Sequence, residues 1–176
     1  FIANGHPQDI IEKLTDQEPY DQRDQLFRNN GDGTYTEVSA ISGAYFSQAY
    51  VGRAAASGDY DNDGDTDIFI MNSNQRAILL RNDGGDRNHW IRIKLVGTRS
   101  NRDGIGARVR LTADGDTQIA EVKSGSSYAS GSDPRLLFGL GQRTKVERIE
   151  VRWPSGITQQ IEDIAGNQTI TITERE

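Results

Sequence analysis

The stretch Gly58–Asn72 reads GDYDNDGDTDIFIMN and is the most informative part of the chain. Its five aspartates fall on alternate positions, namely Asp59, Asp61, Asp63, Asp65 and Asp67. Carboxylates at this density repel one another, by about 1 kcal/mol for each pair about 4 Å apart even in water. The pattern therefore indicates that a cation lies among them.

The spacing of these aspartates supplies hard oxygen ligands of the kind that calcium prefers. Asp59, Asp61 and Asp63 occupy positions 1, 3 and 5 of a loop, and a glycine makes the sharp turn at position 6. Asp65 can give its backbone carbonyl at position 7, and Asp67 closes the set at position 9. The sequence predicts a calcium (Ca2+) site at these five residues.

The segment after the loop distinguishes it from an EF-hand, which needs a bidentate glutamate at position 12 and flanking helices. Position 12 here is Ile70, within the short apolar run Ile68–Met71. A run of this length and composition is typical of a buried strand. We therefore expect a strand–calcium–strand element. A solvated acidic turn is the alternative, which the combined placement of glycine and carboxylates disfavours.

Composition limits the class of protein. The chain has 176 residues with 19 glycines and several short apolar runs, which is typical of a β protein with many turns. It has no cysteine, so it contains no disulfide. No apolar stretch approaches the roughly 18 residues of a membrane span. Residue 1 is Phe rather than Met and the sequence contains no signal peptide, so we expect a fragment of a longer protein.

Charge is distributed unevenly. Residues 1–87 contain 15 acidic and 7 basic side chains, whereas residues 88–176 contain 11 acidic and 13 basic ones. An acidic half with a metal loop makes nucleic acid an unsuitable partner, since phosphate contacts need a concentrated basic face. The basic residues of the second half alternate along predicted strands, which is typical of a solvated sheet face.

The first half contains a loose internal repeat. The motif Leu26–Gly33 recurs at Leu79–Gly85, and Phe1–Asn4 resembles Phe69–Asn72. Repeats of this size indicate propeller blades or solenoid units. We expect strands near 25–29, 34–38, 53–57, 67–72 and 77–82, with a hairpin turn at Asn30-Gly31-Asp32-Gly33 and a short helix around Ile10–Leu14.

The pattern changes near Asp86–Asn88. Short runs with one apolar face come next, such as Ile91-Ile93-Leu95 and Ile149-Val151-Trp153, separated by turn signals. About seven such strands over 85 or so residues predict a small β-sandwich. The Ser/Gly-rich segment Ser124–Ser132 is expected to be a loop at one end of it.

These residues resemble two known families. DYDNDGDTDIFI and the turn in RNNGDGTYTEV are similar to the FG-GAP/VCBS repeats of integrin-like β-propellers, in which a DxDxDGxxD loop binds calcium. NHWIRIKLVG, SNRDGIGARV, LLFGLG and VRWPSG resemble the ASPIC/UnbV domain of cartilage acidic protein-like exported proteins. The resemblance implies an all-β chain with partial β-propeller blades (residues 1–87, about one and a half blades) followed by a small β-sandwich (residues 88–176). It also implies an extracellular or periplasmic location and further blades upstream in the parent chain.

The same sequence indicates which classes of function the chain can have. His6 and His89 lie in no metal or triad pattern, and no cysteine nucleophile exists, so we expect no enzyme activity. Asp103 and Asp133 are expected to cap loops rather than form a second cation site. The preferred hypothesis is a non-enzymatic calcium-binding module for adhesion, scaffolding or protein–protein interaction, with a protein or glycan partner. The alternative is a carbohydrate-binding accessory module of an exported enzyme, in which Trp90 or Trp153 stacks on sugars, although the parity of Trp153 favours core packing.

Overall fold

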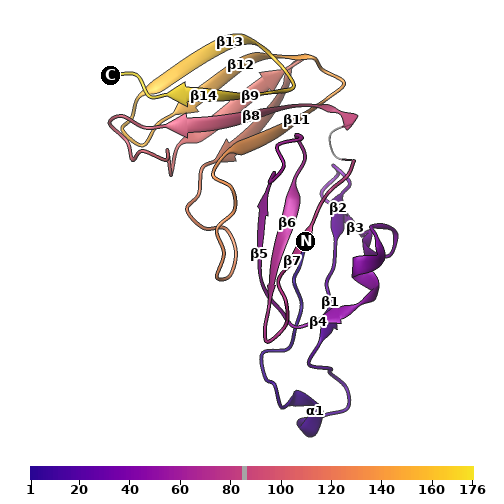
Figure 1. Ribbon diagram of the computed structural model, residues 1–176. Coiled ribbons are helices and arrows are strands. Elements are labelled where there is room, and N and C mark those ends of the chain that lie inside the picture. Colours follow the sequence, from indigo (N-terminus) through magenta and orange to yellow (C-terminus); the bar gives the residue numbers. More distant parts are fainter. Residues whose placement is uncertain (85–86) are drawn as a thin grey trace. The chain divides into compact units, whose positions relative to one another are not determined.

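The computed structural model describes residues 1–84 and 87–176 and is mostly β-strand (Figure 1). The predicted all-β fold is confirmed. Gly85 and Asp86, at which the repeat is expected to end, lie outside the described residues.

Contacts within the chain divide it into two compact units. The first unit comprises Phe1–Ser57, Ile68–Leu80 and Ser127–Ser130, and the second comprises Gly58–Asp67, Arg81–Ser126 and Gly131–Glu176. The aspartate-rich loop thus groups with the second half of the chain, although its motif belongs to the repeat. The domain boundary between residues 87 and 88 stays a prediction.

The first unit consists of short elements in small sheets. Its elements are α1 (Ile11–Leu14), β1 (Gln22–Arg23), β2 (Phe27–Asn29), β3 (Tyr35–Glu37), β4 (Ala49–Tyr50), β5 (Gly52–Gly58), β6 (Asp67–Asn72) and β7 (Ile78–Leu80), with 3-10 turns at Ser39–Ile41 and Ala44–Ser47. Strand β1 pairs with β4, β2 pairs with β3, and β5, β6 and β7 form a three-stranded sheet in that order. The five strands and the short helix expected from the sequence are all present, whereas the two-residue strands β1 and β4 were not predicted.

The hairpin between β2 and β3 is explained by its turn residues. The strands are antiparallel, with Phe27 opposite Glu37. Gly31 and Gly33 have φ values of 84° and 87°, which glycine adopts without strain. The Asn29 side chain accepts the Gly31 N–H at 2.9 Å, so the turn is also fixed by a local hydrogen bond.

The second unit contains a seven-stranded β-sandwich (Figure 1). Its strands are β8 (His89–Val96), β9 (Arg108–Ala113), β10 (Asp116–Glu121), β11 (Leu136–Gly141), β12 (Lys145–Arg152), β13 (Thr158–Ala165) and β14 (Gln168–Thr173). One sheet has the order β10-β9-β12-β13 and the other β11-β8-β14, in which β14 runs parallel to β8. The predicted sandwich is confirmed.

Alternation places the apolar residues of both sheets in one core. Ile91, Ile93 and Leu95 of β8 face this core, as do Ile149 and Val151 of β12. Trp153 continues the parity of β12, is only 2% exposed, and donates its indole N–H to Gln159 at 2.9 Å. Core packing of Trp153 is therefore confirmed.

The end of the chain is fastened to the loop after β8 through Glu174, whose side chain is buried. Its carboxylate accepts backbone N–H groups from Thr98, Arg99 and Ser100 at 2.9, 2.9 and 2.7 Å, and hydroxyls from Ser100 and Ser155. Burial alone would raise the pKa of Glu174, but these hydrogen bonds to the charged form outweigh it and lower the pKa to about 2.

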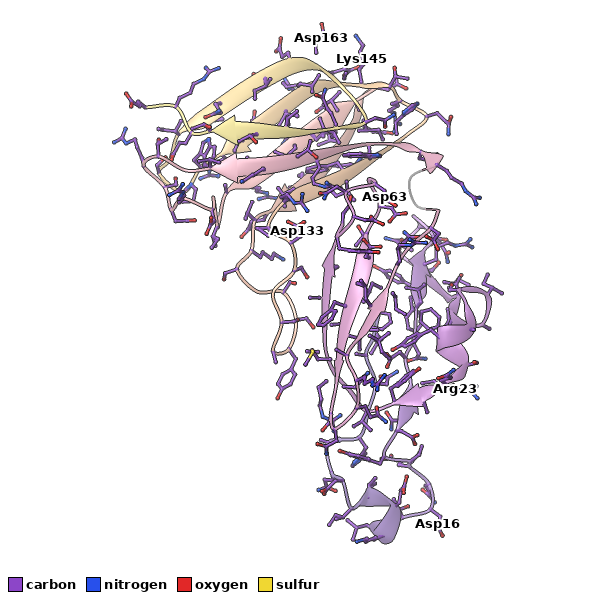
Figure 2. The ribbon with its side chains drawn as sticks, viewed as in Figure 1. Asp16, Arg23, Asp63, Asp133, Lys145 and Asp163 are labelled. Carbon is purple, nitrogen blue, oxygen red and sulfur yellow. The ribbon has the colours of Figure 1, made fainter. Side chains whose placement is uncertain are left out.

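One ion pair of the sandwich lies on its surface. Lys145 at the start of β12 contacts Asp163 of β13 at 3.0 Å, and both side chains are exposed (Figure 2). Such pairs contribute little to stability because water screens them. The buried charges of this unit are Glu174 and those around the aspartate-rich loop.

Candidate metal site

The loop between β5 and β6 carries the predicted metal ligands. Asn62 and Gly64 both have positive φ, at 62° and 103°, and these two left-handed residues turn the chain sharply. Asp59 and Asp67 lie at the two ends of the loop and are buried, whereas Asp61 is exposed. The turn therefore brings aspartates from both ends together.

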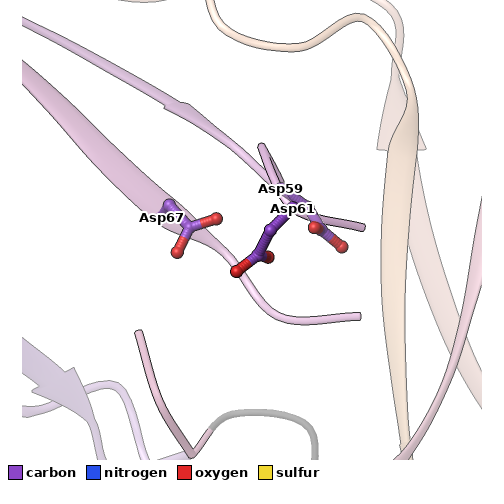
Figure 3. Close-up of side chains that lie close together, drawn as sticks. All are labelled: Asp59, Asp61 and Asp67. Atoms are coloured by element: carbon purple, nitrogen blue, oxygen red, sulfur yellow. The ribbon is translucent and has the colours of Figure 1, made fainter. Parts of the chain in front are cut away.

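Three of the five predicted ligands form one cluster. Asp59, Asp61 and Asp67 each place one carboxylate oxygen so that the three atoms lie within 4.8 Å of one another (Figure 3). Asp63 and Asp65 do not join the group that the described residues form. Asp65 was expected to contribute its backbone carbonyl, and its side chain is buried in the loop.

Backbone N–H groups orient the two buried aspartates. Asp59 accepts the N–H groups of Asp63 and Gly64 at 3.1 and 2.8 Å. Asp67 accepts those of Tyr60 and Asn82 at 3.1 and 2.9 Å. These bonds fix the carboxylates in place before any ligand arrives, which is the arrangement that a preorganised cation site requires.

Asp63 and Asp61 differ in their hydrogen bonding. Asp63 accepts the N–H of Asp65 at 3.1 Å and so shapes the turn. Asp61 accepts no hydrogen bond from the described residues, so its carboxylate is available to a ligand. Three carboxylates this close repel one another, and hard oxygen donors of this type suit calcium. The residues present therefore fit a divalent cation.

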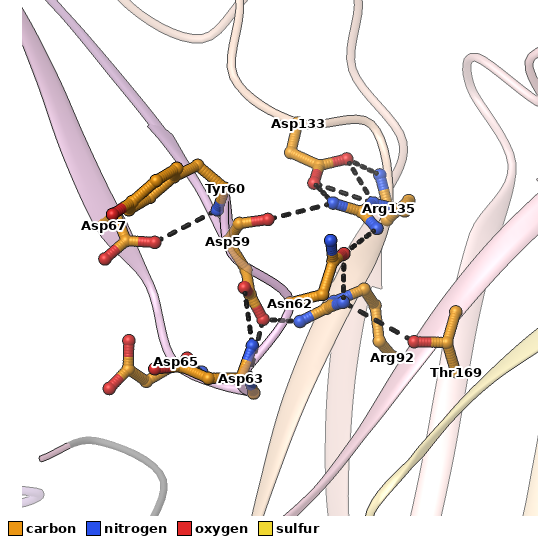
Figure 4. Close-up of polar contacts among 11 residues, drawn as sticks. Asp59, Tyr60, Asn62, Asp63, Asp65, Asp67, Arg92, Asp133, Arg135 and Thr169 are labelled. Atoms are coloured by element: carbon orange, nitrogen blue, oxygen red, sulfur yellow. Dashed lines mark hydrogen bonds and ion pairs between the residues drawn. The ribbon is translucent and has the colours of Figure 1, made fainter. Parts of the chain in front are cut away.

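A buried arginine of the sandwich contacts this cluster. Arg92 of β8 forms an ion pair with Asp59, and both side chains are almost fully buried, at 2% and 3% exposed (Figure 4). Arg92 also donates to the Asn62 side chain at 3.2 Å, and its guanidinium lies 5.1 Å from the centre of the Trp90 ring. Burial lowers the pKa of Arg92 and the nearby Arg135 lowers it further, yet an arginine remains charged at neutral pH.

A second arginine holds the same loop from the segment before β11. Arg135 donates to the Asn62 side chain at 2.9 Å and to the backbone carbonyl of Asp59 at 3.2 Å. Asp133 in turn contacts Arg135 at 2.6 Å (Figure 4). Burial alone would raise the pKa of Asp133, but hydrogen bonds from Arg135 outweigh it and lower the pKa. Asp133 also accepts the backbone N–H of Arg135 at 2.9 Å, so the loop-capping interpretation of this residue holds.

The turn of the loop packs against an aromatic ring. A side chain at Gly64 would overlap the indole of Trp90, so only glycine allows the loop to lie this close to β8. Two structural constraints therefore require glycine at residue 64, namely its positive φ and its close approach to Trp90.

Sequence reasoning did not find the two arginines. Arg92 alternates with core residues on β8, and such basic residues were interpreted as a solvated sheet face. That interpretation is wrong for Arg92, because its side chain is buried against the loop. No local signal marks it, since its partner lies 33 positions earlier in the chain.

Two protein families match the chain. The FG-GAP-like repeat family matches residues 16–70, and the ASPIC and UnbV family matches residues 97–176. No curated protein matches it. The first match contains all five aspartates of the loop and the second contains Arg135, while Arg92 lies between them. The chain therefore contains a segment that matches the FG-GAP-like repeat, followed by a segment that matches the ASPIC and UnbV domain.

Proposed function

We propose that this chain is a non-enzymatic, calcium-binding module of an extracellular or periplasmic protein, and that it serves adhesion, scaffolding or protein–protein interaction. The observation that supports it is the cluster of Asp59, Asp61 and Asp67, whose oxygens lie within 4.8 Å of one another. In this proposal calcium is structural. It joins the two ends of the loop and relieves the repulsion between the carboxylates.

The chemistry of the cluster favours calcium over smaller or softer ions. All three ligand atoms are carboxylate oxygens, whereas zinc and copper sites usually include nitrogen or sulfur. Magnesium demands a near-ideal octahedron and keeps several waters, while calcium accepts six to eight oxygens in flexible geometry. Backbone carbonyls of the loop and water can complete such a shell.

The family matches support the exported location and the role in interaction. FG-GAP-like and ASPIC and UnbV segments are typical of extracellular or exported proteins, where calcium is available at about millimolar concentration. None of the helices in the described parts of the chain has the length and apolar content that a membrane-spanning helix requires. The partners we propose are a protein or a glycan, together with further repeats of the parent chain.

Calorimetric titration with calcium tests this function directly. We expect one site for the parent chain and loss of binding in Asp61→Asn, which removes a ligand charge without removing a hydrogen bond of the loop. Asp103→Asn is the matched control, because Asp103 is an exposed turn aspartate outside the cluster and should leave binding unchanged. Equal binding by the parent and Asp61→Asn would refute the assignment of this site.

A second function, carbohydrate binding, is favoured by a cavity beside the loop. The cavity has a volume of about 430 Å³ and is lined by Trp90, Thr66, Asn82 and His89, among others. An aromatic ring beside amide, hydroxyl and imidazole groups suits the faces and hydroxyls of a sugar. Trp153 takes no part, because it is buried in the core.

Titration with a panel of oligosaccharides tests this second function. We expect binding to be lost in Trp90→Ala and Asn82→Ala and kept in Tyr128→Ala, which removes an exposed aromatic ring outside the cavity. Absence of binding to every sugar of the panel, or binding that survives both cavity substitutions, would remove this candidate.

A further inference from the structure

We propose that Arg92 is a built-in counter-cation of the metal loop, which neutralises Asp59 in the absence of calcium and thereby weakens calcium binding. The inference rests on the proposed function, since it concerns the affinity of the same site. In this inference, a residue of the sandwich strand β8 determines how tightly a loop of the repeat binds calcium.

The first support is the burial of the pair. A buried carboxylate without a positive partner is strongly unfavourable, and removal of one member of a buried pair leaves the other uncompensated. Asp59 and Arg92 are both almost inaccessible to solvent and contact each other. The carboxylate of Asp59 is therefore neutralised by the protein itself, without any bound ion.

The second support is the fixed position of the guanidinium. Arg92 donates to Asn62 of the loop, and Thr169 of β14 accepts at 3.5 Å (Figure 4). The guanidinium of Arg92 also lies over the ring of Trp90. Contacts on the loop, on its own strand and on the neighbouring strand hold the charge in one place. It therefore remains beside the cluster when a second cation enters.

The third support is the charge of the cluster. Asp59, Asp61 and Asp67 carry three negative charges, and Arg92 leaves them with two. Among the contacts that the described residues make, Asp61 and Asp67 have no basic partner, so Asp59 alone is neutralised. A calcium ion held by the cluster would share Asp59 with the guanidinium and would lie near a charge of its own sign. Both effects reduce its affinity.

The experiment compares variants of the full chain by calorimetric titration with calcium and by thermal unfolding in chelator. Arg92→Met removes the charge and keeps much of the volume, and Arg92→Gln is a second neutral variant. Arg92→Lys keeps the charge. Lys94→Met removes one positive charge from an exposed position two residues further along β8 and is the matched control.

We expect the neutral variants to melt at a lower temperature than the parent in chelator and to bind calcium about tenfold more tightly. A tenfold change is what one unit charge exerts on a divalent ion about 6 Å away at a water-like dielectric constant. Arg92→Lys should stay close to the parent affinity, and Lys94→Met should change neither property. A neutral variant that is unfolded in chelator and folds when calcium is added would also support the inference.

Failure of the inference differs from failure of the proposed function. If the parent binds calcium and the neutral variants bind it equally or more weakly, the proposed function stands and the role of Arg92 is refuted. If the parent does not bind calcium but the neutral variants do, Arg92 fills the place of the cation, and the proposed function of the parent is refuted. If neither binds, or if both neutral variants stay unfolded with and without calcium, the inference is refuted.

Discussion

Adding calcium should raise the melting temperature of the second unit of this chain. Calcium that binds the folded loop but not the unfolded chain stabilises it by mass action. For a dissociation constant of about 10⁻⁴ M, 1 mM calcium adds roughly 1.4 kcal/mol to the free energy of unfolding. For a chain of this size that corresponds to a rise of roughly 3–6 °C, and a further tenfold increase in calcium adds about as much again.

Tryptophan fluorescence is the appropriate measurement. Both tryptophans of the chain, Trp90 and Trp153, belong to the second unit, so their emission reports the unfolding of the unit that contains the loop. Trp90 packs against the turn of the loop at Gly64 and senses its release. Magnesium at the same concentration should give a smaller shift, since its octahedral shell fits this cluster less well. An identical midpoint in 1 mM calcium and in chelator would refute the reasoning.

Three further predictions concern the framework of the site. Gly64→Ala should destabilise the second unit by about 1–3 kcal/mol or more, because the new methyl group would overlap the Trp90 side chain and the residue has a positive φ. An unchanged midpoint of urea unfolding would contradict this prediction. Ile149→Ala should cost about 2–5 kcal/mol in the same assay, because its fully buried side chain lies in the sandwich core, and a cost below 1 kcal/mol would show that the core collapses around it. Glu174→Gln should have a lower free energy of unfolding than the parent above pH 4.5, and this difference should shrink as the pH falls towards 2. The reason is that the folded state lowers the pKa of Glu174 to about 2. A difference that does not vary with pH would show that the charge of this carboxylate does not stabilise the fold.

Local patterns predicted most of the fold. The alternation of Ile149, Val151 and Trp153 placed all three in the core, and the Asn-Gly-Asp-Gly turn placed the hairpin between β2 and β3. These features depend on residues within a few positions of one another. The parallel pairing of β14 with β8 joins segments about 77 positions apart, and no local pattern in either segment predicts this pairing.

The aspartate-rich loop was predictable in part, because its ligand spacing is also a local pattern. The spacing of the aspartates indicated a cluster, and Asp59, Asp61 and Asp67 do lie together. The contribution of Arg92 and Arg135 could not be read from the sequence, because only the tertiary fold brings these residues to a loop that lies more than 30 positions earlier in the chain. Glu174 was missed similarly, since the backbone N–H groups that bind it lie more than 70 positions earlier.

Strand β8 lies outside both matched segments, yet it is the central strand of the sheet β11-β8-β14. A gene fusion that began at residue 97 would inherit β11 and β14 without the strand that joins them. Such a fusion would also lack the core residues Ile91, Ile93 and Leu95, so the hydrophobic core of the sandwich would be exposed on one side. The smallest portable piece of this protein therefore begins before His89, and a transplant that is also to carry the acidic loop must begin before Gly58.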